Sequence, residues 1–133
     1  MKSIFLIGSL FFCFGAFAQK TDQLSTIDFV EVLNGNHAEA AYYYQHNWKE
    51  LREMAVKRGY IASFQILETE PSAEAPFHLM LITTYANRSQ YDQREPHFQE
   101  LIRENGELKL LNELKPADFR KTLFGKEAVA HWH

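Results

Sequence analysis

The chain has 133 residues, of which 46% are hydrophobic and 14% aromatic, and its formal net charge at pH 7 is −3. A chain of this length predicts one domain, and a mildly acidic balance without a basic cluster argues against nucleic acid or an anionic membrane surface as a partner. The single cysteine, Cys13, lies in the N-terminal apolar run, so the remainder of the chain has no disulfide and no cysteine metal ligand.

The N-terminus has the three parts of a secretory signal peptide. Lys2 supplies the basic start, residues 4–15 form a short apolar run, and small residues end the segment at Ala18. The run is shorter than the roughly 20 residues needed to span a bilayer. We expect residues 1–18 to be cleaved after Ala18, leaving an exported periplasmic or secreted domain that is not membrane-bound. An uncleaved anchor or a lipid on Cys13 are the less favoured alternatives.

The first half of the remaining chain predicts strand, helix, strand. Residues 19–26 are polar and indicate a flexible lead-in, whereas residues 27–33 are rich in β-branched and aromatic side chains and indicate a strand. A helix is expected from the Asn36 cap to Gly59, because apolar residues recur there at spacings of three and four. This apolar stripe consists of Ala41, Tyr44, Trp48, Leu51 and Ala55. Residues 60–68 predict the second strand.

The second half predicts another strand, helix and strand. Residues 77–85 are almost continuously apolar, which indicates a strand that is buried on both faces. The next helix begins near Ser89 or, because a proline lies inside the segment, near Glu95. Residues 108–114 predict a further short helical piece, and residues 118–132 predict a last extended segment.

The order β-α-β-β-α-β is typical of a ferredoxin-like α+β sandwich over residues 27–133. In that fold an antiparallel four-stranded sheet carries two main helices on one face. The two-sided apolar character of residues 77–85 then requires a cover for the second face. A second copy of the same sheet is the simplest cover, so the sequence predicts a homodimer.

Two stretches of the chain share features with a known group of proteins. They consist of Tyr43 to Ser63, with Trp48-Lys49 and Arg58-Gly59-Tyr60-Ile61, and of Phe77 to Tyr85 with Asn87, Tyr91 and Glu95-Pro96-His97-Phe98. Together they resemble the dimeric α/β-barrel superfamily, and the second stretch is similar to the antibiotic-biosynthesis-monooxygenase type of module. The resemblance covers most of residues 27–132 and implies a dimeric barrel. The superfamily includes cofactor-independent monooxygenases, haem-degrading enzymes and chlorite-dismutase relatives, so the resemblance does not select an activity.

Three residues are candidates for catalysis. His78 shares a strand face with Met80, and a histidine that faces a barrel cavity can transfer a proton or bind haem. The alternative is a hydrogen-bonded histidine near a strand end. Tyr85, at the end of the same strand, and His97, on the next helix, complete the candidate catalytic set.

Trp48 and Met80 are the candidates for ligand binding, although the place of Trp48 on the apolar stripe also fits a core residue. The sequence predicts no metal site and no cofactor, because the two histidines of the tail, His131 and His133, are too few for a built site. The favoured function is therefore an exported homodimer that binds a small apolar ligand in or near the cavity between its two sheets. The alternative is a cofactor-independent monooxygenase-like or haem-active enzyme that uses the candidate catalytic set.

Overall fold

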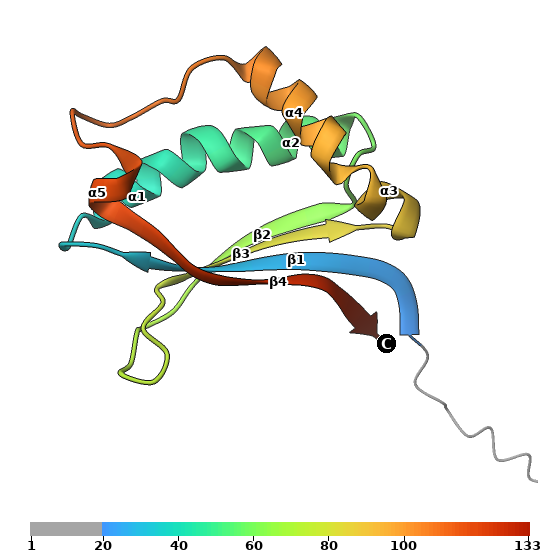
Figure 1. Ribbon diagram of the computed structural model, residues 1–133, viewed down its shortest axis with the longest axis horizontal. Coiled ribbons are helices and arrows are strands. Elements are labelled where there is room, and N and C mark those ends of the chain that lie inside the picture. Colours follow the sequence, from blue (N-terminus) through green and yellow to red (C-terminus); the bar gives the residue numbers. More distant parts are fainter. Residues whose placement is uncertain (1–19) are drawn as a thin grey trace, which may run out of the picture.

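The computed structural model describes residues 20–133, which form one four-stranded sheet with its helices gathered on one side (Figure 1). The expected signal peptide, residues 1–18, lies outside the described residues, as does its cleavage site after Ala18. Within residues 20–133, no helix is both long enough and apolar enough to cross a membrane.

The sheet consists of β1 (Lys20–Val32), β2 (Ser63–Glu68), β3 (Leu79–Tyr85) and β4 (Arg120–Trp132). The strands lie in the order β2-β3-β1-β4, and each neighbouring pair is antiparallel. An open antiparallel sheet with helices confirms the α+β class that the sequence predicts.

The helices are α1 (His37–Tyr43), η1 (Tyr44–Trp48), α2 (Lys49–Lys57), α3 (Arg88–Asp92), α4 (Arg94–Asn105) and the short α5 (Pro116–Phe119). The first three form one continuous helical segment, in agreement with the helix that the apolar stripe predicts. A helix also follows the third strand, as expected, but it is divided into α3 and α4.

A π-helical turn, η1, joins α1 to α2, and the apolar spacing of the sequence does not predict it. Two side chains of this turn form hydrogen bonds with backbone carbonyls four residues earlier in the chain. Asn47 Nδ2 donates to Tyr43 O at 2.8 Å, and His46 Nδ1 lies 2.9 Å from Tyr42 O. Such turns widen a helix locally and are frequent at functional sites. Here the turn ends at Trp48. The Trp48 ring contacts the guanidinium of Arg52, a residue that lines the polar pocket described in the next subsection.

The flexible lead-in expected over residues 19–26 is wrong for residues 20–26, which form the first half of β1. Leu24 lies opposite Tyr85 of β3 on one side and opposite Ala130 of β4 on the other. Backbone hydrogen bonds to two neighbouring strands stabilise this polar stretch, and tertiary pairing of that kind overrides local strand propensity.

The helical piece expected over residues 108–114 is also wrong, because the structure has no helix between α4 and α5 (Pro116–Phe119). The backbone of Lys109 is instead bonded to Asn47: Asn47 Nδ2 donates to Lys109 O, and Lys109 N–H donates to Asn47 Oδ1, both at 2.8 Å. The leucine spacing that suggested a helix arises because Leu110 and Leu114 reach down to a core cluster around Phe119.

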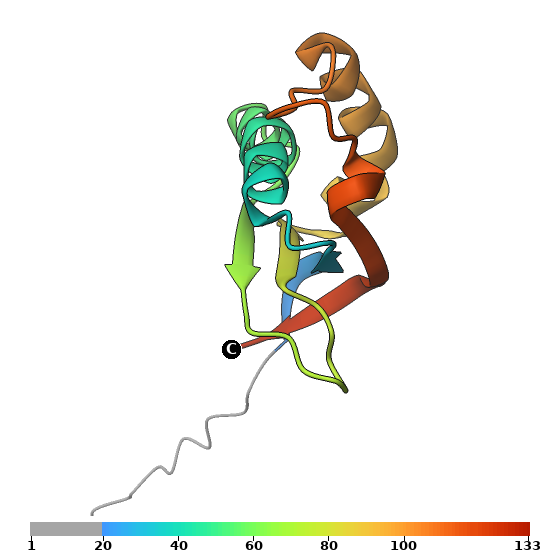
Figure 2. The same ribbon diagram turned by 90° about the vertical axis from the view of Figure 1, so that its left-hand side faces the viewer.

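Alternation along the strands divides the sheet into two faces. On the helix side Val30, Leu81 and Tyr85 are buried in the core clusters. The second face, here called the open face, carries Ile27, Phe29, Leu67, Met80, Ile82 and Phe124. In Figures 1 and 2 the helices of the described chain lie on the helix side, and the connection between β2 and β3 extends beyond the open face.

Candidate functional site

His78 lies just before β3 and fastens it to β1. Its backbone N–H donates to Val30 O at 2.8 Å, and the backbone N–H of Val32 donates to His78 Nδ1 at 3.0 Å. The ring also lies edge-on to His37, with 5.4 Å between the ring centroids. Because Nδ1 accepts a hydrogen bond from a backbone N–H, the geometry corresponds to the hydrogen-bonded histidine near a strand end, which is the alternative that the sequence left open.

His97 lies on α4, and its ring stacks on Tyr60 with 3.7 Å between the ring centroids. The hydroxyl of Tyr60 donates to Glu100 Oε2 at 2.9 Å, so Tyr60 contacts two residues of α4, His97 and Glu100. His97 Nδ1 is buried and has no hydrogen-bond partner within residues 20–133. Neither of the two pockets described below includes His97 or His78.

Tyr85 lies at the end of β3 on the helix side and is 2% exposed. Its ring meets Tyr91 edge-on at 5.4 Å. Burial raises the pKa of Tyr85, although Arg52 and Arg94 partly oppose the rise. Tyr85 is thus the one member of the candidate catalytic set that lines a polar pocket, and the structure does not bring it together with His78 and His97.

The two candidate ligand-binding residues lie on opposite sides of the sheet. Trp48 packs against the helix side, where its ring meets Phe64 edge-on at 5.9 Å. Met80 lies on the open face, opposite Phe29 of β1 and Leu67 of β2. The two side chains therefore cannot share one cavity within a single chain.

The described residues contain a polar pocket between the helix side of the sheet and helices α2 and α4, with a volume of about 260 Å³. Its polar lining consists of Thr26, Asp28, Arg52, Tyr85, Arg94, Glu95 and Glu127, and its apolar walls are Leu51, Phe98 and Ile102. Charged groups of both signs thus converge on one hollow from β1, β4, α2 and α4. Such a convergence of titratable groups is a recognised mark of a functional site.

Arg52 is the central residue of the polar pocket. Its guanidinium carbon lies 4.2 Å from the ring centroid of Trp48 and 4.4 Å from that of Phe98, so the guanidinium contacts two aromatic rings. Its Nε donates to Thr83 Oγ1 at 3.2 Å. Burial lowers the pKa of Arg52 to about 10, because a low-dielectric environment penalises the charged form.

Asp28 occupies the floor of the pocket because the strand beside it has no side chain at that position. Gly125 of β4 lies opposite Asp28, and a Cβ atom there would come within 2.7 Å of Asp28 Oδ1. Burial raises the pKa of Asp28, and the positive charge of Arg52 reduces this rise. Gly125 therefore makes room for a carboxylate in a place where burial disfavours its charged form.

Glu127 is directed into the pocket by an irregularity in β4. The register between β1 and β4 shifts between Ser25 and Ile27, and Ala128 adopts a φ of 50°. Bulges of this kind redirect side chains and are frequent beside active sites. The Oε2 atom of Glu127 accepts from the Tyr91 hydroxyl at 2.9 Å and lies 3.5 Å from Arg94 Nη2.

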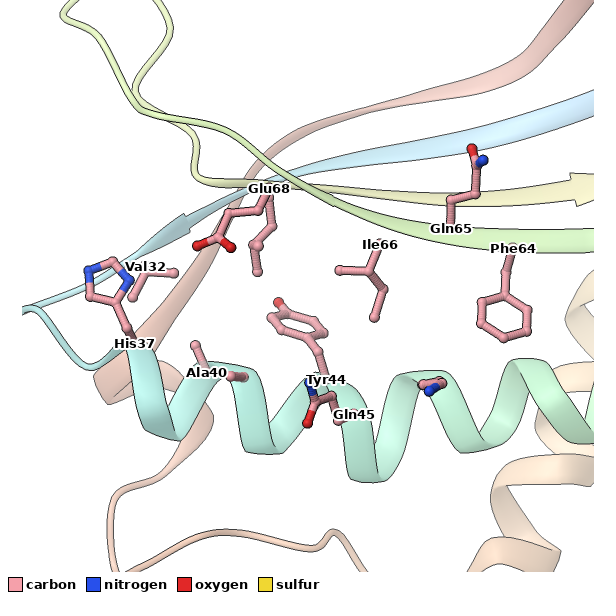
Figure 3. Close-up of a pocket in the computed structure, with 12 residues that line it drawn as sticks. Val32, His37, Ala40, Tyr44, Gln45, Phe64, Gln65, Ile66 and Glu68 are labelled. Carbon is pink, nitrogen blue, oxygen red and sulfur yellow. The ribbon is translucent and has the colours of Figure 1, made fainter.

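A second hollow of about 430 Å³ is an apolar groove between the α1–η1 helix and edge strand β2. Figure 3 shows the ring of Tyr44 rising from the helix towards the sheet, between Ala40 and Ile66, with Glu68 and His37 at one end. Burial raises the pKa of Tyr44, so its hydroxyl stays neutral at physiological pH. The groove could hold an apolar molecule, but it gathers fewer charged groups than the polar pocket.

Arg52, Asp28 and Glu127 are not among the residues that the sequence predicts for the site. Asp28 alternates in step with buried Val30 along the strand, and Arg52 lies four residues after Trp48 on the helix, so both share a face with apolar residues. A charged residue on an apolar face is a stronger sign of function than a histidine near a strand end. Glu127 carried no signal, because its direction depends on a bulge.

The described residues hold no group of three or more histidine, cysteine, aspartate or glutamate side chains placed to bind a metal ion. No family model matches the chain, and no curated protein or solved structure matches it either.

Proposed function

We propose that the chain is an exported homodimeric domain of ferredoxin-like topology that binds a small apolar ligand in or near the cavity between its two sheets. The strand order β2-β3-β1-β4, with helices between β1 and β2 and between β3 and β4, supports this topology. Export is supported by the basic start, apolar run and small-residue ending of residues 1–18.

The observation that carries the dimer is the aromatic and aliphatic surface of the open face. Phe29 stacks on Phe124 with 4.5 Å between the centroids, and Phe77 meets Phe29 edge-on at 4.8 Å. Phe124 and Leu67 remain 47% and 39% exposed. Apolar side chains gathered on one face of a sheet gain stability when a partner covers them.

The size of the open face is compatible with a stable pair. Two strands of 13 residues and two of six and seven residues, at about 3.3 Å per residue and about 4.8 Å between strands, span roughly 600 Å² in projection. Side chains make the accessible area larger than this projection. A standard interface buries about 800 Å² on each partner.

A second candidate function is a cofactor-independent monooxygenase-like or haem-active enzyme. The observation in its favour is the convergence of Asp28, Arg52 and Tyr85 on the polar pocket, each with a pKa shifted by burial. Of the residues first chosen for this activity, only Tyr85 takes part. The second candidate would be favoured if the protein turned over an oxidisable substrate and the Tyr85→Phe variant did so more slowly.

Native mass spectrometry of protein exported and purified without added ligand tests the first proposal. We expect a chain that begins at Gln19, two copies per particle, and additional mass from a retained apolar molecule. An empty dimer would contradict the ligand, and a folded monomer would contradict the dimer.

A matched pair of variants tests whether the open face forms the interface. Phe124 lies on the open face and Leu111 lies far from it in the α4–α5 connection, yet both side chains are 47% exposed. We expect Phe124→Glu to give folded monomers in size-exclusion chromatography and Leu111→Glu to remain dimeric. Equal behaviour of the two variants would remove the open face from the proposal.

A further inference from the structure

The guanidinium of Arg52 is partly buried and makes few polar contacts. Within residues 20–133 its one hydrogen bond runs from Nε to Thr83 Oγ1, and no carboxylate of the same residues lies within 4.0 Å of it. Arginine has five N–H donors, and only one of them has an acceptor within residues 20–133. Among these residues the terminal amino groups of Arg52 have no acceptor, so they are available to a molecule in the pocket.

The neighbouring charges do not supply that acceptor. Asp28 acts on Arg52 through space only, and Oε2 of Glu127 accepts from the Tyr91 hydroxyl and pairs with Arg94. The contacts with Trp48 and Phe98 restrict the position of the guanidinium, since its carbon atom lies 4.2 and 4.4 Å from the two ring centroids. Arg52 lines the polar pocket and so offers a fixed fork of donors to a molecule inside it.

The other residues of the pocket restrict the charge and shape of that molecule. Asp28, Glu95 and Glu127 repel a dianion such as phosphate about twice as strongly as a monoanion, so among anions the pocket favours one with a single charge. The walls formed by Phe98 and Ile102 favour an apolar body. A volume of about 260 Å³ admits only a small molecule.

We propose that the polar pocket binds a small organic monocarboxylate, with the carboxylate on the terminal N–H groups of Arg52 and the apolar body against Phe98 and Ile102. The site lies within one chain on the helix side of the sheet. It is separate from the cavity proposed between two sheets, and it does not depend on the dimer.

Calorimetric titration of the chain from residue 19 to 133 tests this site with benzoate, phenylacetate and hexanoate as probes. Benzamide, which has the shape of benzoate without its charge, is the control ligand. We expect at least one of the acids to bind with at least tenfold higher affinity than benzamide. If none of the three acids binds more tightly than benzamide, the proposal is wrong.

The variant Arg52→Met keeps an unbranched chain between the two rings but removes the fork of donors. We expect it to weaken carboxylate binding at least tenfold, whereas Arg103→Met, an exposed arginine of α4 outside the pocket, should bind like the wild type. Equal loss in both variants would overturn the assignment to Arg52.

A second variant, expected to strengthen carboxylate binding, keeps the test decisive if Arg52→Met does not fold. Asp28→Asn removes a negative charge beside the proposed carboxylate, so it should tighten binding several-fold at neutral pH. Unchanged or weaker binding in Asp28→Asn would overturn the proposed position of the anion. Size-exclusion chromatography of the same samples reports the dimer independently, so failure of one proposal is distinguishable from failure of the other.

Discussion

The two faces of the sheet differ in what covers them and in what they carry. The face covered by helices holds the core residues Val30 and Leu81 and also Asp28 of the polar pocket, whereas the face left uncovered within residues 20–133 carries Phe29, Met80 and Ile82. Apolar side chains are normally buried and charges normally solvated. The carboxylate on the helix side and the apolar side chains on the open face both depart from that rule, which is why we propose a site on the first face and a contact with another surface on the second.

The largest expected effect comes from placing one charge on either face of β3. Leu81 is 4% exposed on the helix side, and Ile82 is its neighbour on the open face. Burying an unpaired carboxylate costs several kcal/mol, which is comparable to the whole stability of a domain. We expect Leu81→Asp to be unfolded by circular dichroism and Ile82→Asp to be folded but monomeric. Folding of both variants would show that the two faces do not differ as described.

The next effect concerns the space that Gly125 leaves for Asp28. A methyl group 2.7 Å from Asp28 Oδ1 must displace the carboxylate or the strand. We expect Gly125→Ala to lower the free energy of unfolding by about 1–3 kcal/mol, the usual cost of overpacking. Urea denaturation measures this cost.

The double variant supplies the control for that clash. In an Asp28→Ala background the same Gly125→Ala change should cost much less, because the atom that it strikes is gone. An equal cost in both backgrounds would locate the strain in the backbone of β4 rather than at Asp28.

A smaller effect is expected from Arg52→Met. Loss of the contacts with Trp48 and Phe98 removes about 0.5–2 kcal/mol of cation–π attraction. Removal of a buried charge offsets that loss. We expect the free energy of unfolding to stay within about 1 kcal/mol of wild type, or to rise. A decrease of more than about 3 kcal/mol would show that Arg52 serves the fold rather than the pocket.

The smallest effect is a dependence of stability on pH that arises from Asp28. Its folded-state pKa is raised above the ordinary value of 3.8, so the folded protein binds the proton more tightly than the unfolded chain does. Its contribution therefore makes the protein less stable as pH rises from 3.8 through the folded-state pKa. We expect the stability gain of Asp28→Asn over wild type to be larger at pH 7 than at pH 4 in urea denaturation. A gain that is larger at pH 4 would contradict the burial of the carboxylate.

The sequence predicts the strands and the long helix because the spacing of apolar residues follows which side chains of each element are buried. It fails for residues 20–26 and 108–114, where pairing with distant strands and the hydrogen bonds of Asn47 decide the conformation. Local patterns cannot show such long-range contacts.

The candidate site was predicted less well than the fold. Two of the three predicted catalytic residues are histidines, but His78 accepts a hydrogen bond from the backbone of Val32 and His97 stacks on Tyr60. The polar pocket depends on the bulge near Ala128 and on the absence of a side chain at Gly125. Only the folded sheet places these two features beside Arg52.

The most direct test of the account is sedimentation velocity on the chain from residue 19 to 133 at micromolar concentration. The account predicts a dimer, because the apolar side chains of the open face require a cover. A well-folded monomer at that concentration would contradict it, since the open face would then be stable in water without a partner.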